Sequence, residues 1–310
     1  MLKFLKSNAL FVSMLVGIVF YNPLAYLSPA IKYFLFLMLL ITYCRVSLRQ
    51  LKPEPLHFWL ACVQVFGCVS VYLILAPFNR ELAQGCLLCI LAPTATSAPV
   101  FAALLGGSIA CLATYSIASN LSVAFLAPFA LSFLGTHGVG DELTFMQTFW
   151  MICVKVMPLL LAPFILATLM KKFTPKIHSQ LKDRQVFSFW LWVIALAALM
   201  AKTTKDLVGM EREMYSTAAI LASGAAVVCI LQFSTGWYLG RKYGNRIAGG
   251  QGLGQKNTIL VIWMAQTFLN PVVAIAPASY VIWQNLINSY QLWKARKDKS
   301  TKARMGETVS

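Results

Sequence analysis

Long apolar stretches recur along the whole chain, separated by short segments rich in charged and turn-forming residues. Many of them reach the roughly 20 residues that an α-helix needs to cross a hydrocarbon layer of about 30 Å. The pattern therefore predicts an all-α integral membrane protein of ten transmembrane helices, with no sizeable soluble domain. The spans are expected at residues 8–27, 29–44, 56–77, 82–105, 108–134, 144–169, 186–201, 214–239, 248–268 and 271–293.

The ten spans divide into two five-helix repeats, residues 1–140 and 141–293, followed by a basic cytoplasmic tail at residues 294–310. Because five is odd, the second repeat must run through the membrane in the opposite direction to the first. Inverted repeats of this kind are typical of secondary transporters, which bind their substrates near the bilayer midplane.

The composition agrees with this fold class, since 59% of residues are hydrophobic and only 12% are charged, against roughly 25% in soluble domains. The net charge of +16 does not indicate nucleic-acid binding, because no basic run is interleaved with aromatic residues in a soluble module. Nineteen of the 26 lysines and arginines fall on one side of the predicted membrane. By the positive-inside rule we expect a multi-pass protein of the cell (inner) membrane with both termini cytoplasmic.

The side chains that metal or acid–base chemistry needs are scattered. The eight cysteines lie almost all inside apolar segments, where they are expected to pack, and the pair Cys86 and Cys89 has no second pair or nearby histidine. His57, His137 and His178 fall at or outside span ends, and no two acids are paired within a span. We therefore expect no disulfide, no metal site and no enzyme activity.

The fourth span contains two prolines at its centre. Pro93 and Pro99 flank the polar residues Thr94, Thr96 and Ser97. Each proline removes a backbone donor and clashes with the preceding turn, so the helix is expected to unwind between them.

The ninth span is weakened in a different way, by glycines, including Gly252 and Gly254, that lead into a polar run. That run consists of Gln255, Lys256, Asn257 and Thr258. Irregular backbone inside a bilayer is tolerated only where protein or an aqueous cavity satisfies its polar groups. The two breaks occupy the same position in each repeat, which is the pattern expected for the central binding site of a transporter.

Two lysines, Lys155 and Lys256, lie near the middle of predicted spans, where an unpaired charge is costly. All ten acidic residues fall in predicted loops or tails, so neither lysine has a carboxylate partner within the spans. A buried ammonium group must then be stabilised by other polar groups or by a cavity.

At these breaks the chain resembles the bile acid:sodium symporter family. The likeness rests on Pro93 and Thr96 in the first break, Gly107 before the fifth span, Gly254 and Asn257 in the second break, and the segment YVIWQNLINSYQLW in the tenth span. The resemblance implies a core of helices three to five and eight to ten that moves against a panel of helices one, two, six and seven. It also implies transport of organic anions driven by two sodium ions.

The sodium-site residues of the family are only partly present. Its Ser-Asn pair corresponds to Ala98 and Pro99, one helix-five serine to Leu112, and a helix-five threonine to Ser116. The glutamate shared by both sodium sites falls on Gly252 or, with one gap, on Gln251. A helix-three glutamine is kept as Gln64, whereas the helix-nine glutamine is replaced by Lys256.

Sodium in a low-dielectric site prefers oxygen ligands and a negative charge, which these spans do not supply. We therefore expect Lys256 to replace a sodium ion and to hydrogen-bond half-helix carbonyls and Gln64. The other residues expected around the ion position are Ser116, Gln251 and Gln255. The substrate site is expected to be lined by Thr94, Thr96, Ser97, Asn257, Thr258 and Lys155, with half-helix N-termini attracting an anion.

The predicted function is secondary active transport of a small organic anion, bile acid-like or a carboxylate, by alternating access and without the usual sodium coupling. Several alternatives stay open: a sodium-coupled symporter with a degenerate site, proton coupling through Lys256, and a non-transporting membrane sensor. A channel or a Ser–Lys256 enzyme fits the pattern less well. The expected partners are the anion and the lipid bilayer, with no cofactor, no nucleic acid and a monomeric state.

Overall fold

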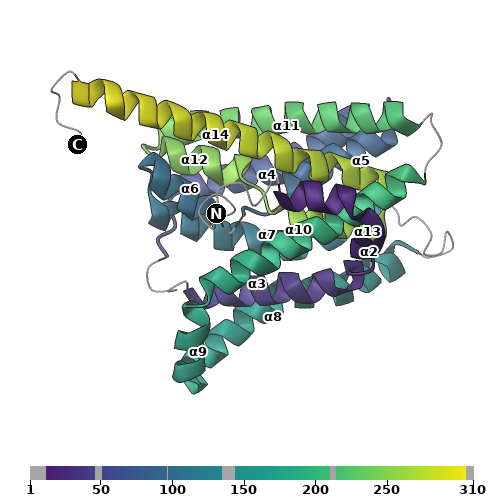
Figure 1. The fold of residues 1–310 in the computed structure, drawn as a ribbon, viewed down its shortest axis with the longest axis horizontal. Coiled ribbons are helices and arrows are strands. Elements are labelled where there is room, and N and C mark those ends of the chain that lie inside the picture. The colour runs from purple at the N-terminus through teal and green to yellow at the C-terminus, as the bar shows by residue number, and fades with distance from the viewer. Residues whose placement is uncertain (1–11, 46–50, 96, 135–143, 210–213, 305–310) are drawn as a thin grey trace.

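The structure, a computed structural model, describes residues 12–45, 51–95, 97–134, 144–209 and 214–304 as a bundle of helices (Figure 1). Residues 12–19 are helical. The elements that follow are α2 (Tyr21–Ala25), η1 (Ser28–Ala30), α3 (Ile31–Arg45), α4 (Pro55–Leu75), α5 (Arg80–Leu91), α6 (Ala98–Leu105), α7 (Ile109–Leu134), α8 (Phe145–Phe173), α9 (Pro175–Lys182), α10 (Gln185–Val208), α11 (Met214–Lys242), α12 (Arg246–Gly254), α13 (Thr258–Phe268), η3 (Pro271–Ala274) and α14 (Ile275–Arg304).

The all-α class predicted from the sequence is confirmed for the described residues. Six helices there are long and apolar enough to cross a membrane: Ser28–Arg45, Pro55–Leu75, Ile109–Leu134, Phe145–Phe173, Val186–Val208 and Tyr215–Lys242. The predicted fourth and ninth spans are each divided into two shorter helices, and α14 continues to Arg304, into the predicted tail. The ten-span topology, the inverted repeats and the repeat boundaries at residues 1–140 and 141–293 stay predictions.

The helices form two groups that lie on opposite sides of the bundle in Figure 1. In one group α3 packs against α8 and α10, and α10 packs against α2. In the other group α4, α11 and α14 pack against α5, α12 packs against α11, α13 packs against α14, and α6 packs against α7. Contacts between α7 and α8, and between α10 and η3, join the groups. The first group holds the helices that the resemblance assigns to a panel, and the second those that it assigns to a core.

Helices α11 and α12 pack closely against each other, and this packing depends on glycine. A Cβ atom added at Gly236 would lie 2.3 Å from the carbonyl oxygen of Gly249, and one at Gly249 would lie 2.2 Å from the carbonyl oxygen of Gly236. A Cβ at Gly240 would lie 2.6 Å from the carbonyl oxygen of Asn245. Small residues four apart allow helix backbones in membranes to approach this closely, and here they fix the first half of the interrupted helix against α11.

Candidate functional site: a crossing of two interrupted helices

The first interruption lies between α5 and α6. The helix ends at Leu91, two residues before Pro93, which cannot donate a backbone hydrogen bond. A helix resumes at Ala98, with Pro99 in its first turn, where the missing N–H costs nothing. Pro93 therefore lies in the break, whereas Pro99 starts the next half-helix.

The second interruption lies between α12 and α13, at Gln255, Lys256 and Asn257. Gly252 lies within α12 and Gly254 is its last residue, so the helix ends directly after these glycines and the break itself falls on the polar run. Their role is packing: a Cβ at Gly254 would lie 2.4 Å from the ring of Phe233, and one at Gly252 would lie 3.0 Å from the ring of Tyr115.

The two breaks cross and pair through their backbones. Thr94 and Lys256 form an isolated antiparallel β-bridge. Ala95 N donates to Gln255 O at 2.8 Å, and Asn257 N donates to Pro93 O at 2.8 Å. Each broken helix thus supplies partners for polar groups that the other leaves without an intrahelical bond.

The end of α5 exposes carbonyl oxygens that a continuous helix would have satisfied. The Lys256 side chain satisfies two of them, since its Nζ donates to Ile90 O and to Ala92 O, both at 2.9 Å. The residue is 1% exposed. Because these oxygens lie at the negative end of the α5 dipole, they favour an ammonium group there.

Gln64 of α4 holds the same helix end from the other side. Its Nε2 donates to Leu91 O at 2.8 Å and to Ala92 O at 3.1 Å. Its Oε1 accepts from Tyr115 OH at 3.1 Å and from Ser119 Oγ at 2.9 Å. Lys256 therefore bonds to half-helix carbonyls as predicted. It does not bond directly to Gln64; instead, both side chains donate to Ala92 O.

The Thr94 side chain caps the C-terminal end of α12. In an unbroken helix Lys256 N would donate to Gly252 O, but here it donates to Gln284 Oε1 at 2.9 Å. The hydroxyl of Thr94 takes its place and donates to Gly252 O at 2.8 Å. Thr94 N, in turn, donates to Ser119 Oγ at 3.2 Å.

Ser116 and Asn120 of α7 lie beside the first break. Ser116 Oγ and Asn120 Nδ2 both donate to Thr94 O at 3.4 Å. The Oδ1 atom of Asn120 is buried and has no hydrogen-bond partner. This position therefore offers an unused oxygen close to the crossing.

Gln251 and Gln255 form a buried polar cluster against α14. Gln251 Nε2 donates to Asn288 Oδ1 at 2.9 Å, and Asn288 Nδ2 donates to Gln255 Oε1. Gln255 Nε2 reaches Ser97 Oγ at 3.4 Å, and Ser97 is exposed. The cluster thus connects the centre of the crossing with an accessible surface at the start of α6.

The remaining predicted substrate residues divide into two sets. Asn257, half-buried, and Thr258, buried, lie at the start of α13 beside the crossing. Lys155 lies elsewhere: it is exposed on α8, and its Nζ is 5.6 Å from the ring centre of Phe268, at the other end of α13. That end is about 15 Å along the helix axis from Thr258, so the structure does not bring Lys155 to the crossing. Thr96 lies outside the described residues.

Sequence reasoning missed several residues that complete the site. Ser119, Gln284 and Asn288 all bond directly to residues of the breaks, and Tyr280 OH donates to Gly254 O at 2.9 Å. The usable signal would have been the polar positions Gln284, Asn288 and Gln291, which follow one another at helical spacing in the last span.

In comparison with known families, residues 32–210 match the family model described as Sodium Bile acid symporter family. The match covers more than half of the chain and includes the first break, but it ends before the second. A search of curated proteins gives no match.

Proposed function

The chain belongs to the sodium bile acid symporter family, and from that premise we propose that it is a secondary transporter of a small organic anion that works without the usual sodium coupling. Family membership and the apolar helices make it a multi-pass membrane protein. Members of this family are transporters of bile acids and other organic anions and not enzymes. The substrate, the coupling and the altered ion site are the proposed part.

The observation that carries the proposal is the position of the Lys256 ammonium group. It lies 2.9 Å from two carbonyl oxygens that the break in α5 leaves without intrahelical partners. Free carbonyl oxygens at a helix C-terminus are also good ligands for a cation. An ammonium group bound there supplies the positive charge without a bound metal ion, and two cations so close together would repel each other.

The anion is proposed to bind beside the crossing, at the starts of α6 and α13. N-terminal ends of half-helices carry partial positive charge and favour an anion. Ser97 is exposed and Asn257 half-buried, so both are available to a ligand, whereas Thr94 and Lys256 are buried and position the backbone. Movement of the core group of helices against the panel group would then expose this site to either side in turn.

Lys155 is proposed to act at a different point of the path. It belongs to the panel helix α8 but its ammonium group lies over Phe268, at the end of the core helix α13. An exposed positive charge at this boundary can attract an organic anion before it reaches the crossing. We place both termini in the cytoplasm, the protein in the inner membrane and its active state as a monomer.

Transport into proteoliposomes tests the proposal. Purified protein is reconstituted, and uptake of a labelled bile acid and of a small dicarboxylate is measured with inward gradients of sodium or of potassium. We expect equal uptake in both salts, and uptake that depends on Lys256. Stimulation by sodium would support the degenerate-symporter alternative, stimulation by an inward proton gradient would support proton coupling, and binding without flux would support a sensor.

A further inference from the structure

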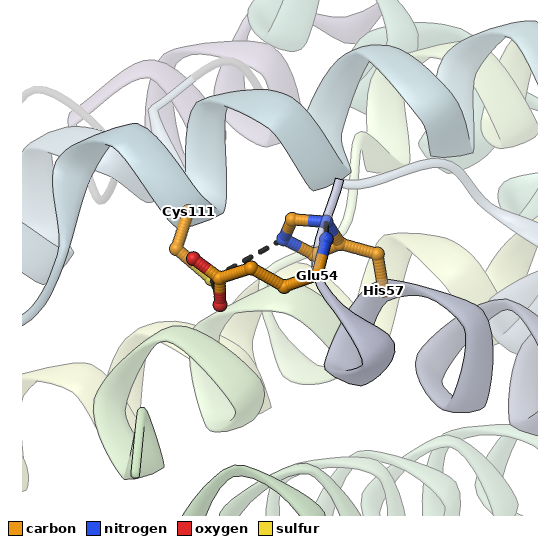
Figure 2. A group of neighbouring side chains, drawn as sticks. All are labelled: Glu54, His57 and Cys111. Carbon is orange, nitrogen blue, oxygen red and sulfur yellow. Dashed lines mark hydrogen bonds between the residues drawn. The ribbon is translucent and has the colours of Figure 1, made fainter. Parts of the chain in front are cut away.

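Three side chains with metal-binding atoms meet at the edge of the core group, away from the crossing. They are Glu54, the residue before α4, His57 in the first turn of α4, and Cys111 in the first turn of α7. Figure 2 shows the three side chains converging on one point between the two helices. One ligand atom from each residue lies within 4.8 Å of the other two.

The sequence predicts no metal site, but the fold brings Cys111 beside His57 and Glu54. We propose that these three residues bind a divalent transition-metal ion of the zinc class. A thiolate, an imidazole nitrogen and a carboxylate oxygen are the donor types that zinc takes in proteins. This inference does not depend on the proposed transport function.

The spacing of the donors fits such an ion. Cys111 Sγ lies 3.2 Å from His57 Nε2 and 3.3 Å from Glu54 Oε2. A tetrahedral ion with bonds of about 2.0 Å to nitrogen or oxygen and about 2.3 Å to sulfur would hold each of these pairs about 3.5 Å apart. The third pair, the His57 nitrogen and the Glu54 carboxylate oxygen, lies within 4.8 Å, so a turn of the half-buried Glu54 side chain would complete the site.

The charges also balance. Cys111 as thiolate and Glu54 as carboxylate carry two negative charges, a neutral His57 adds none, and a divalent ion cancels them. His57 and Cys111 are 7% and 3% exposed, and a neutral cluster is favoured in such a buried position. Glu54 is half-buried, so ion and solvent can enter along its side chain and leave the fourth ligand position to water.

The ion-free geometry shows which bonds must change. Glu54 N donates to His57 Nδ1 at 3.0 Å, so the ring proton is on Nε2 and faces Cys111 Sγ. On binding, the ion takes Nε2, the ring proton moves to Nδ1, and the thiol proton of Cys111 is released to solvent. One hydrogen bond at the start of α4 is lost, and its donor, on a half-buried residue, can turn to water. Binding should therefore release one proton per ion and strengthen as pH rises.

The position of the cluster gives the ion a structural role. Asn245, the residue before α12, donates from Nδ2 to Glu54 Oε2 at 3.0 Å, so three chain segments meet there. The ring of His57 also stacks on Tyr115, whose OH donates to Gln64. A metal ion would thus tie together the ends of α4, α7 and α12 on the side of the core next to residues that hold the crossing.

Cobalt absorption tests the site on the full-length protein in detergent. The protein is stripped of metal with a chelator and titrated with Co²⁺. A thiolate-to-metal charge-transfer band reports ligation by cysteine, and intense d–d bands report tetrahedral geometry. Zn²⁺ is then added to displace the bound Co²⁺. We expect one Co²⁺ per chain, displacement by Zn²⁺, and a melting temperature that Zn²⁺ raises. The matched control is Cys62→Ser. Cys62 is a half-buried cysteine of α4, the helix that carries His57, and among the described residues it belongs to no cluster of potential metal ligands.

Cys111→Ser should abolish the charge-transfer band while Cys62→Ser keeps it, and His57→Gln and Glu54→Gln should each weaken binding by about tenfold or more. Absence of the band in the wild-type protein, or its persistence in Cys111→Ser, overturns the proposal. The three side chains would then only hydrogen-bond one another at the start of α4. If Cys111→Ser does not fold, the other two variants decide: unchanged Co²⁺ affinity in both refutes the site.

Discussion

Thr94 and Lys256 pair through their backbones at the point where two helices stop, and each also caps the helix that the other belongs to. The Thr94 hydroxyl donates to Gly252 O in α12, and the Lys256 ammonium donates to Ile90 O in α5. The exchange is reciprocal, because the chain segment opposite each break donates to a carbonyl oxygen that the break leaves without an intrahelical partner. Breaking either helix without the other would leave these groups buried and unpaired, at a cost of about 1–3 kcal/mol each.

Replacement of Thr94 by valine tests this exchange. The variant keeps the shape of the side chain but loses the donor to the carbonyl oxygen of Gly252, a buried residue, and this oxygen then loses its hydrogen bond. We expect a loss of about 1–2 kcal/mol in the free energy of unfolding, the upper part of the range for interhelical hydrogen bonds in membranes. Denaturant titration in mixed micelles provides the measurement.

Thr168→Val is the matched control for that experiment. The Thr168 hydroxyl also donates to a carbonyl, Phe164 O at 2.9 Å, but within its own helix and on an exposed face. Its removal should change stability by less than about 0.5 kcal/mol. Equal effects of the two substitutions would show that the Thr94 hydroxyl has no special part in the crossing.

Replacement of Lys256 by methionine should separate stability from transport. The variant removes two hydrogen bonds, but it also removes the cost of burying an ammonium group, and these effects oppose each other. We expect folded protein with stability changed by only about 1–2 kcal/mol and uptake reduced to background. Lys32→Met, at an exposed lysine near the start of α3, should keep uptake. Normal uptake by Lys256→Met would contradict the proposed role of the ammonium group.

The sequence was sufficient to locate both breaks because their causes are local. Pro93 ends α5 through its own ring and missing donor, and the polar run after Gly254 cannot be satisfied within one apolar helix. The partners could not be predicted, since Ser119 and Gln284 reach the crossing only through the packing of α7 and α14. The position of Lys155 likewise depends on how panel and core meet.

Glycine shows why a local pattern does not reveal every role of a residue. The same residue weakens a helix and permits close helix packing, and sequence alone does not separate the two. Gly254 is the last residue of α12 before the break, and it also makes room for the ring of Phe233. Which of these roles a glycine has depends on the residues that pack against it, and these are determined by the fold.

The packing of α11 on α12 gives a third prediction. Gly236→Ala should cost about 1–3 kcal/mol, because its Cβ would lie 2.3 Å from the carbonyl oxygen of Gly249 and backbone must move to admit it. Gly67→Ala is the control, since its Cβ would meet only Ile90 Cγ2 at an ordinary 3.7 Å and alanine favours the helix. Thermal unfolding of both variants in the same detergent gives the comparison, and a Gly236→Ala protein as stable as Gly67→Ala would show that the two helices can separate freely.

The last prediction concerns Lys155, whose charge lies on the panel while the proposed anion site lies in the core. If it attracts the anion on its way to the crossing, Lys155→Ala should raise the half-saturating anion concentration about fivefold or more, with little change in maximal uptake, because only an early binding step is weakened. Increasing ionic strength should reduce wild-type uptake towards that of the variant, since screening weakens long-range attraction.

Lys205→Ala is the control: Lys205 makes the same kind of contact, with its Nζ 4.9 Å from the ring centre of Tyr26, on a different part of the panel group. An equal effect of both substitutions would assign the change to general surface charge, and a fall in maximal uptake at unchanged half-saturation would place Lys155 in the movement of the panel instead of in anion capture.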